Sequence, residues 1–355
     1  MGNTFLLEPN YLEIVYRDLV KMPGSVEQMK MKSAERIGVL GIPFSKGQSR
    51  VGTEYGPEVL RNGGIVRKLQ NLGCHVQDHG DVEVIQVEND DPEENAKNPR
   101  TVGLTSKLIA DKVERVLRSE DICLGLGGDH SMAIGTIAGN ARVEPDLVVL
   151  WIDAHADINT PMTSDSGNIH GMPLAFLVRE LESYVPKLPG FEWLSPCIHA
   201  KDIAYIGLRD VDAGERKIIE KFGITAFSMQ EVDKYGINEV VERALRAVDP
   251  EGKRPIHLSF DVDAMDPTLT PSTGTPVIGG LSLRETYYIA EEVARTGRLS
   301  MVDVAEVNPL LGDEKDKKLT VDMTISVIQR FFGNRRGGCY PPGYDIPLPH
   351  KLMTR

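Results

Sequence analysis

Cysteine is scarce in this chain, and the few cysteines lie far apart. The 355 residues contain four of them, and no two form a Cys-x-x-Cys pair: Cys74, Cys123, Cys197 and Cys339. Such spacing is typical neither of a disulfide-stabilised scaffold nor of a thiol-ligated zinc site. We therefore expect reduced thiols in an intracellular protein.

Long apolar runs and net positive charge are also missing. No stretch approaches the ~20 apolar residues of a membrane-spanning helix, so we expect no membrane partner. The formal net charge is −12 and the pI is near 5.2, which argues against a nucleic-acid-binding surface. An acidic balance is compatible with a small cationic substrate, although most acidic proteins simply have acidic surfaces.

The first residues lack the features of a targeting segment. The acids Glu8, Glu13 and Asp18 interrupt a stretch that has neither a basic start nor an apolar core. Gly2 would suit N-myristoylation, but that motif needs Ser or Thr at the sixth position, where this chain has Leu6. We expect a cytoplasmic location and leave a mitochondrial one open.

What the chain does contain is a regular alternation of apolar strand-like runs and amphipathic helical segments. This pattern predicts a three-layer α/β/α fold with a mostly parallel central sheet. Among the expected helices are one over residues 56–73 and one over residues 172–184. We expect three parts along the chain, namely an N-terminal extension (1–35), a catalytic α/β domain (36–333) and an irregular C-terminal tail (334–355) that is a candidate subunit contact.

Polar side chains gather where the expected strands end. In "LVVLWIDAHADINTP" the acidic and imidazole groups of Asp153, His155 and Asp157 occupy every second position after an apolar run. Side chains at alternate positions share one side of an extended chain, so these three converge if the strand persists. Asp261 and Asp263 repeat the pattern in "SFDVDAMDP". Parallel α/β sheets place their sites at these carboxyl ends.

These strand ends, together with His130 in "GGDH", offer four carboxylates and two imidazoles. Taken singly, an Asp after a strand is usually a capping or turn residue, and a lone His is usually an ordinary core or loop residue. Their combination at three strand ends favours a metal site, because crowded carboxylates repel one another unless a cation neutralises them. The mixed oxygen and nitrogen set suits Mn²⁺, and six ligands indicate two ions about 3.5–4 Å apart.

Several longer motifs resemble a known enzyme family. The motifs "GGDHS", "DAHADINTP", "SGNIHGMP" and "SFDVDAMDP" resemble those of the ureohydrolases, the binuclear manganese amidinohydrolases. The motifs "IPFSKGQSRVGTEYGP", "GLRDVDAGE", "TGTPVIGGL" and "VAEVNP" are similar to those of arginases within that family. The resemblance covers roughly residues 36–333. One departure is Met172, where certain arginases have Gln.

The resemblance implies hydrolysis of L-arginine to L-ornithine and urea by a hydroxide that bridges two Mn²⁺ ions. It implies the same six metal ligands that the spacing selects: His130, Asp153, His155, Asp157, Asp261 and Asp263. It also implies catalytic functions for three residues. Asp157 would hold the hydroxide and relay its proton, His170 would protonate the leaving amine, and Glu306 would pair with the guanidinium.

Substrate selectivity is expected in the loops that follow the strands. The family pattern places Asn159, Ser164, Ser166 and Asn168 around the α-carboxylate of the substrate. Asp212 and Glu215 would face its α-amino group, with Thr275 and Asp210 as supporting residues. The resemblance also implies a homotrimer or homohexamer. The loop over residues 88–99 has no predicted function.

Two alternatives remain open at this point. Another ureohydrolase, such as an agmatinase or guanidinobutyrase, would share the metal ligands. The polar stretch "NTPMTSDSGN" argues against it, because a substrate without an α-carboxylate would leave those groups unpaired. The second alternative is a catalytically silent metal-binding or regulatory protein, which the presence of His170 and Glu306 disfavours.

Overall fold

Eight parallel strands form a single sheet in the order β2-β1-β3-β8-β7-β4-β5-β6. The computed structural model describes residues 35–338 and 344–347. The strands are β1 (Arg36–Ile42), β2 (His75–Asp81), β3 (Ile122–Gly127), β4 (Val148–Ile152), β5 (Ile203–Leu208), β6 (Thr225–Ser228), β7 (Ile256–Asp261) and β8 (Leu299–Ala305). The predicted N-terminal extension lies outside the described residues except for position 35, and so does most of the predicted tail.

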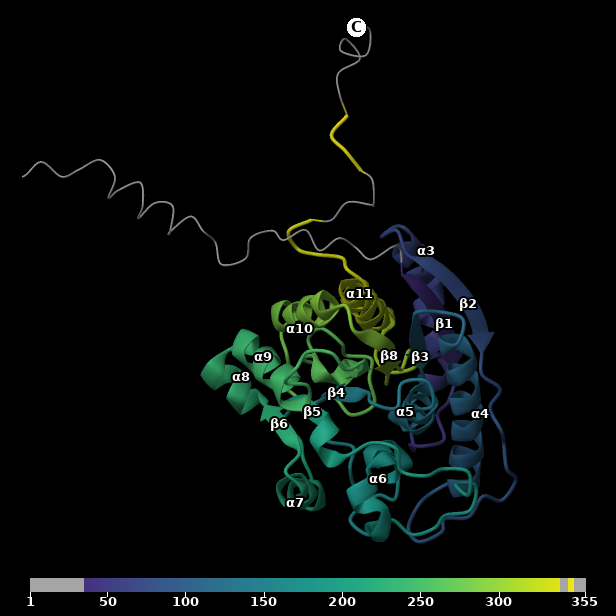
Figure 1. Cartoon of the computed structure of the whole chain (residues 1–355). Helices are drawn as coiled ribbons and strands as arrows, with labels where there is room; N and C mark the ends of the chain where they lie inside the picture. The colour runs from purple at the N-terminus through teal and green to yellow at the C-terminus, as the bar shows by residue number, and fades with distance from the viewer. Residues whose placement is uncertain (1–34, 339–343, 348–355) are drawn as a thin grey trace, which may run out of the picture. The chain divides into compact units, whose positions relative to one another are not determined.

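Helices lie between successive strands and cover both faces of the sheet (Figure 1). They are α2 (Gly56–Asn62), α3 (Ile65–Gln70), α4 (Pro99–Leu117), α5 (Ala133–Ala141), α6 (Pro173–Leu177), α7 (Ala213–Phe222), α8 (Met229–Tyr235), α9 (Ile237–Val248), α10 (Leu283–Thr296) and α11 (Glu314–Phe331). Within the described ranges, no helix is long and apolar enough to cross a bilayer.

The side chains of the central strands alternate between two hydrophobic layers. In β4, Val148, Leu150 and Ile152 belong to the layer formed with α2, α3, α9, α10 and α11, whereas Val149 and Trp151 belong to the layer formed with α5, α6 and α7. This period of two is expected for a sheet that is buried on both faces. The predicted three-layer α/β/α fold with a parallel sheet is confirmed.

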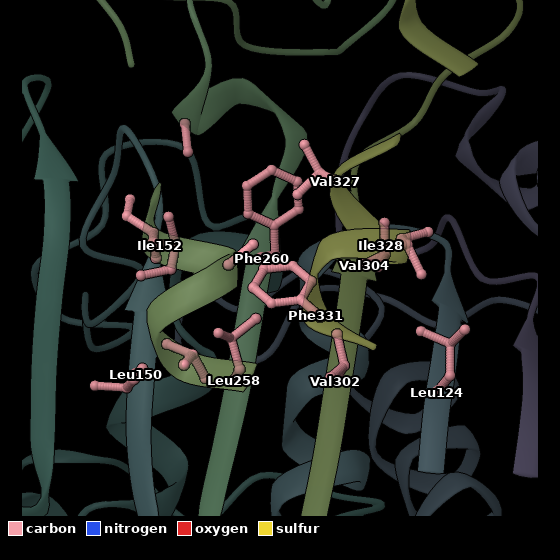
Figure 2. Packing of buried hydrophobic residues seen from close by; sticks show 14 of the residues in the cluster. Leu124, Leu150, Ile152, Leu258, Phe260, Val302, Val304, Val327, Ile328 and Phe331 are labelled. Carbon is pink, nitrogen blue, oxygen red and sulfur yellow. The ribbon is translucent and has the colours of Figure 1, made fainter. Parts of the chain in front are cut away.

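The packing of α11 on the sheet shows how one layer is held (Figure 2). The ring of Phe260 in β7 meets that of Phe331 in α11 edge to face, with centroids 6.0 Å apart. Val302, Val304 and Ile328 of the same cluster lie beside this pair. Burying a side chain of this size stabilises the fold by about 1.5–3 kcal/mol, so this contact helps to hold α11 on the sheet.

The structure differs from the sequence-based expectations at two helices and contains one strand and one helix that were not expected. The helix expected over residues 56–73 is broken into α2 and α3, because Gly64 takes a left-handed conformation (φ 85°). The helix expected over residues 172–184 stops at Leu177, where extended Val178 separates α6 from a 3₁₀ turn over residues 179–184. The third difference is an unforeseen strand and helix, β6 and α8. Strand β6 is only four residues long and half-buried, so it has little apolar periodicity to reveal it.

Candidate active site

Four neighbouring strands in the middle of the sheet bring the predicted metal and catalytic residues to one edge. In the order β3-β8-β7-β4, the carboxyl ends of these strands lie side by side. His130 lies in the turn after β3 and Glu306 follows β8, while Asp261 ends β7. The segment from Asp153 follows β4. The strand-end rule therefore holds for this site.

His130 lies at the centre of a group of three carboxylates. Its Nδ1 atom is 3.1 Å from one oxygen each of Asp153, Asp157 and Asp261. The other ring nitrogen, Nε2, is 2.8 Å from the hydroxyl of Ser259, and the ring stacks on Trp151 with centroids 4.2 Å apart. If Nε2 donates to Ser259, the Nδ1 lone pair points at the carboxylates.

This group fits a cation better than it fits a network of hydrogen bonds. His130 and Asp153 are fully buried, and within the described part of the chain Nδ1 has no well-directed hydrogen bond. One imidazole holds at most one extra proton, so three buried carboxylates around it leave uncompensated negative charge. A divalent cation bound among these four atoms would neutralise that charge.

A second group of donors shares Asp153 with the first. His155 Nδ1 is 3.2 Å from Asp263 Oδ2 and 3.5 Å from Asp153 Oδ1. The two oxygens of Asp153 thus face different histidines, and they are oriented by the Trp151 indole N–H (2.9 Å) and by the backbone N–H of His155 (2.7 Å). The site offers two adjacent positions for a metal ion, with Asp153 between them.

The pKa values of these carboxyl groups reflect their crowding. Burial raises the pKa of Asp261 well above its usual value, and the charges of Asp263 and Asp153 raise it further. Burial and the Asp153 charge likewise raise the pKa of Asp263 to about 6. For Asp153 burial acts in the same direction, but the interactions with the nearby imidazoles of His130 and His155 outweigh it and lower the pKa. The four acids compete for the available positive charge.

The three polar side chains after β4 converge for a different reason from the one expected. Strand β4 ends at Ile152, and Asp157 takes a left-handed backbone conformation with φ 48°. Glu306 does the same with φ 66°. A left-handed conformation in a residue other than glycine costs of order 1–3 kcal/mol and persists only where its surroundings enforce it. An irregular turn, not a continued strand, therefore aims Asp157 at His130.

A polar cavity of about 150 Å³ opens beside the two groups. All seven residues predicted to bind substrate line it: Asn159, Ser164, Ser166, Asn168, Asp212, Glu215 and Thr275. His155, Asp157, Asp261 and His170 contribute to the same wall, as do Gly171 and Asp210. The loops after β4, β5 and β7 thus meet over the metal-ligand candidates.

Hydrogen bonds connect the walls of this cavity. The Asn159 amide donates to Asp212 (2.7 Å), and both oxygens of Glu215 accept backbone N–H groups, from Ile158 (3.1 Å) and Asp212 (3.0 Å). Burial, reinforced by the charge of Asp157, raises the pKa of Glu215 to about 8. Glu215 therefore ties the loop after β4 to the start of α7. Thr275 lies behind a ligand candidate, since its hydroxyl donates to Asp263 (3.0 Å).

A pair formed by half-buried His170 and buried Glu306 lies at the cavity wall. His170 Nδ1 is 3.2 Å from Glu306 Oε1, and Glu306 also accepts from the His130 backbone N–H (3.0 Å) and from Gln48 (2.6 Å). Although burial opposes it, the interaction with Glu306 raises the pKa of His170 to about 9, and the same pairing lowers the pKa of Glu306. His170 lines the cavity, whereas Glu306 is 1% exposed and does not.

Some residues that contact the site were not predicted from the sequence. Gln48 lies within the quoted "IPFSKGQSRVGTEYGP" motif, but only the fold brings it to Glu306. Arg209 donates to the carbonyls of Asp263 (2.6 Å) and Val277 (2.7 Å) and so connects the loops after β5 and β7. Met172 is fully buried among apolar side chains and does not line the cavity.

Comparison with known proteins shows the family of this chain. The model of the arginase family matches residues 35–333. The chain belongs to the arginase family. It is 53% identical to human arginase-1 over 307 residues, which is 86% of this chain and 95% of that protein. Another arginase-family relative, the hepatic arginase of Aquarana catesbeiana, is 51% identical over 90% of this chain and 99% of its own length.

Solved structures of the family share the fold. Arginase from Bacillus caldovelox superposes with a TM-score of 0.78 at 35% identity, covering 85% of this chain and 99% of that one. Arginase from Bacillus subtilis has a TM-score of 0.76 at 36% identity, with the same coverage of both chains. The resemblance found in the motifs is confirmed, and so is the predicted enzyme class, a hydrolase that acts on a guanidino group.

Proposed function

We propose that the protein is an arginase that hydrolyses L-arginine to L-ornithine and urea with two Mn²⁺ ions. The observation that carries this proposal is one polar cavity that is lined both by His/Asp ligand candidates and by the loop after β4. A guanidinium directed at the ligand candidates would leave the amino-acid end of the substrate facing Asn159, Ser164 and Asp212.

The proposed metal site uses the two groups that share Asp153. His130, Asp157 and Asp261 would hold one ion together with Asp153, and His155 and Asp263 would complete the other position. A mixture of carboxylates and imidazoles favours Mn²⁺ over Mg²⁺ and Ca²⁺. When bound, manganese would lower the pKa of water and so supply a nucleophile near neutral pH.

The protein's own residues would then handle protons and orientation. The Asp157 carboxylate, aimed into the cavity by its left-handed backbone, would accept a proton from the attacking water. Glu306, which lies behind His170 and does not itself line the cavity, would supply the negative charge that orients the guanidinium. His170, whose pKa the pairing with Glu306 raises to about 9, would donate the proton that the leaving amine needs.

Recognition of the amino-acid end is assigned to the loops. Asn159, Ser164, Ser166 and Asn168 would surround the α-carboxylate, directly or through water. Asp212 would face the α-amino group, with Glu215 holding it in place through the backbone. A substrate that lacks the carboxylate would leave these polar groups unpaired, which disfavours its binding.

A urea-release assay across guanidino compounds, with and without added Mn²⁺, tests the proposal. We expect L-arginine to be the best substrate and activity to depend on Mn²⁺. Equal or better use of agmatine would make the protein an agmatinase. If the Mn²⁺-loaded protein released no urea from any guanidine, the silent metal-binding alternative would replace ours.

Substitution of Asp212 tests the assignment of the amino-acid end. We expect Asp212→Ala to raise the KM for L-arginine by about tenfold or more while metal content stays unchanged, because one partner of the α-amino group is lost. Steady-state kinetics and elemental analysis measure the two quantities. Asp165→Ala is the control, since Asp165 is exposed and does not line the cavity. An unchanged KM in Asp212→Ala contradicts the assignment.

The proposal also covers the oligomeric state of the protein and its location in the cell. We expect a homotrimer or homohexamer, with the segment after Gly333 as the candidate contact, and sedimentation analysis of the full chain measures the state. We expect a cytoplasmic location, with a mitochondrial one as the alternative because some relatives, such as human arginase-2, are named mitochondrial. Cell fractionation decides between the two compartments.

A further inference from the structure

The loop over residues 88–99 has an unusual backbone. Four of its residues other than glycine take left-handed conformations: Asn89 (φ 54°), Glu94 (φ 46°), Asn95 (φ 69°) and Asn98 (φ 51°). In the described part of the chain only two more such residues occur, and these are Asp157 and Glu306 of the site. Asn is the residue other than Gly that tolerates this conformation best. The 88–99 loop therefore shares with the site a backbone conformation that is rare in residues other than glycine.

The 88–99 loop is hydrogen-bonded to residues 159–168, which we call the substrate loop. The Asn95 side-chain amide donates to two backbone carbonyls there, those of Pro161 (2.9 Å) and Ser164 (2.7 Å). The backbone N–H of Lys97 donates to the Gly167 carbonyl (2.9 Å). The two loops approach so closely that a Cβ at Gly167 would lie 2.1 Å from the Asn95 carbonyl oxygen.

The substrate loop depends on these contacts for its placement. Its first half is tied to α7 through Asn159 and Asp212. In its second half the side chains make only short local turns, with Ser164 accepting from Gly167 N–H (3.0 Å) and Ser166 from Asn168 N–H (3.2 Å). Such turns shape the loop locally. The contacts with Asn95 and Lys97 connect this half of the loop to the neighbouring 88–99 loop.

The 88–99 loop is itself well anchored, so it can act as a support. Asp90 accepts the backbone N–H groups of Arg100 (3.2 Å) and Thr101 (2.7 Å) at the start of α4. The Asn98 amide donates to the carbonyl of Lys46 (2.9 Å), and buried Ala96 pairs with Glu93. Asn95 therefore connects the substrate loop to a helix of the core.

We propose that Asn95 is a positioning residue that sets the place of Ser164, Ser166 and Asn168, and through them the preference for a substrate with an α-carboxylate. The inference rests on the proposed arginase function. An amide suits the position because it donates two hydrogen bonds to two carbonyls, whereas a carboxylate there would repel both. Since the loop faces the amino-acid end of the substrate, Asn95 acts on binding and not on guanidinium chemistry.

The variant Asn95→Gly isolates the side chain, because glycine keeps the left-handed backbone without strain. We expect the KM for L-arginine to rise about tenfold, in keeping with the loss of two hydrogen bonds, while kcat changes less than about twofold. The Ki of agmatine, measured as a competing ligand whether or not it is cleaved, should not change, because agmatine has no α-carboxylate. Asn95→Asp should raise the KM at least as much.

The matched control is Asn89→Gly. Asn89 shares the loop and the left-handed backbone, and among the described residues it makes no hydrogen bond to the substrate loop. We expect wild-type kinetics for this variant. A wild-type KM in Asn95→Gly, or an equal weakening of L-arginine and agmatine, overturns the inference. Failure of the proposed function is distinguishable, since the unaltered enzyme would then release no urea from L-arginine.

Discussion

Two histidine–aspartate clusters are built into the central sheet, and they differ in how many carboxylates face each imidazole. At the sheet edge, the His130 ring meets three carboxylates, each 3.1 Å from Nδ1. In the sheet interior, His257 Nε2 meets only Asp303 (2.9 Å), and both residues are fully buried. Burial is therefore not what distinguishes them.

The interior cluster contains a single carboxylate, and its Oδ2 atom is hydrogen-bonded to His257 and Thr136. Among the described residues, the buried Oδ1 atoms of Asp303 and Asn140 have no hydrogen-bond partner. The Thr136 hydroxyl donates to Asp303 at 2.5 Å, and Asn140 lies between His257 Nδ1 (3.2 Å) and Ser300 (3.0 Å). The edge cluster has more negative charge than hydrogen bonding can satisfy, and it borders a polar cavity. The difference teaches that an excess of buried carboxylates over nearby positive charge, and not the presence of a His–Asp pair, indicates a metal site.

Removing one carboxylate from the edge cluster should have the largest effect. We expect Asp261→Asn to lose at least one metal ion and most of the activity, because a neutral amide is a weaker ligand for a hard cation. Elemental analysis and urea release measure both, with the exposed Asp165→Asn as the control. Two tightly bound ions in Asp261→Asn would contradict the proposal that the carboxylates of the edge cluster hold the metal.

Removing the carboxylate of the interior cluster should affect the fold instead. Asp303→Ala leaves the buried His257 Nε2 without its partner and removes the shorter hydrogen bond of Thr136, so we expect the free energy of unfolding to fall by roughly 2–5 kcal/mol. Urea denaturation followed by circular dichroism measures this loss. Metal content per folded molecule should stay at the wild-type level, and its loss would mean that the two clusters form one coupled system.

Ser259 offers an intermediate test, because it lies on β7 between His257 and Asp261 and bonds to His130. We expect Ser259→Ala to weaken metal binding by about 10–100-fold, as residues that orient a ligand histidine do. A chelator competition assay measures the affinity. Ser300→Ala removes a hydroxyl of the interior cluster and should leave metal affinity unchanged. Equal effects of the two variants would contradict the separation of the clusters.

The smallest effect should be a pH dependence of stability at the cavity wall. The pKa of His170 in the folded protein, about 9, is higher than its ordinary 6.5. Its contribution to stability is therefore full below pH 6.5 and is lost as the pH rises through about 9. In chelator-treated protein, the thermal midpoint of the wild type should fall over this window more steeply than that of His170→Asn. Parallel curves for the two proteins would show that His170 does not titrate there.

The strand–helix alternation was predictable because it depends on local periodicity, and the apolar runs before Asp153 and Asp261 are strands β4 and β7. The positions of the ligand candidates were predictable because parallel strands bring their carboxyl ends to one edge. The length of α6 was not predictable, since the backbone turns extended at Val178 within a run that reads as helical. The roles proposed for the site residues stay predictions.

By itself the sequence determined the class of fold, the family motifs and the residue types at the strand ends, because these depend on periodicity and on neighbours along the chain. Only the tertiary structure decided the strand order and the left-handed turns at Asp157 and Glu306, which need surroundings that enforce them. It also decided the contact of Asn95 with Ser164, 69 residues apart in sequence. Contacts at such separations depend on how helices and loops pack over the whole sheet, and no local pattern encodes that packing.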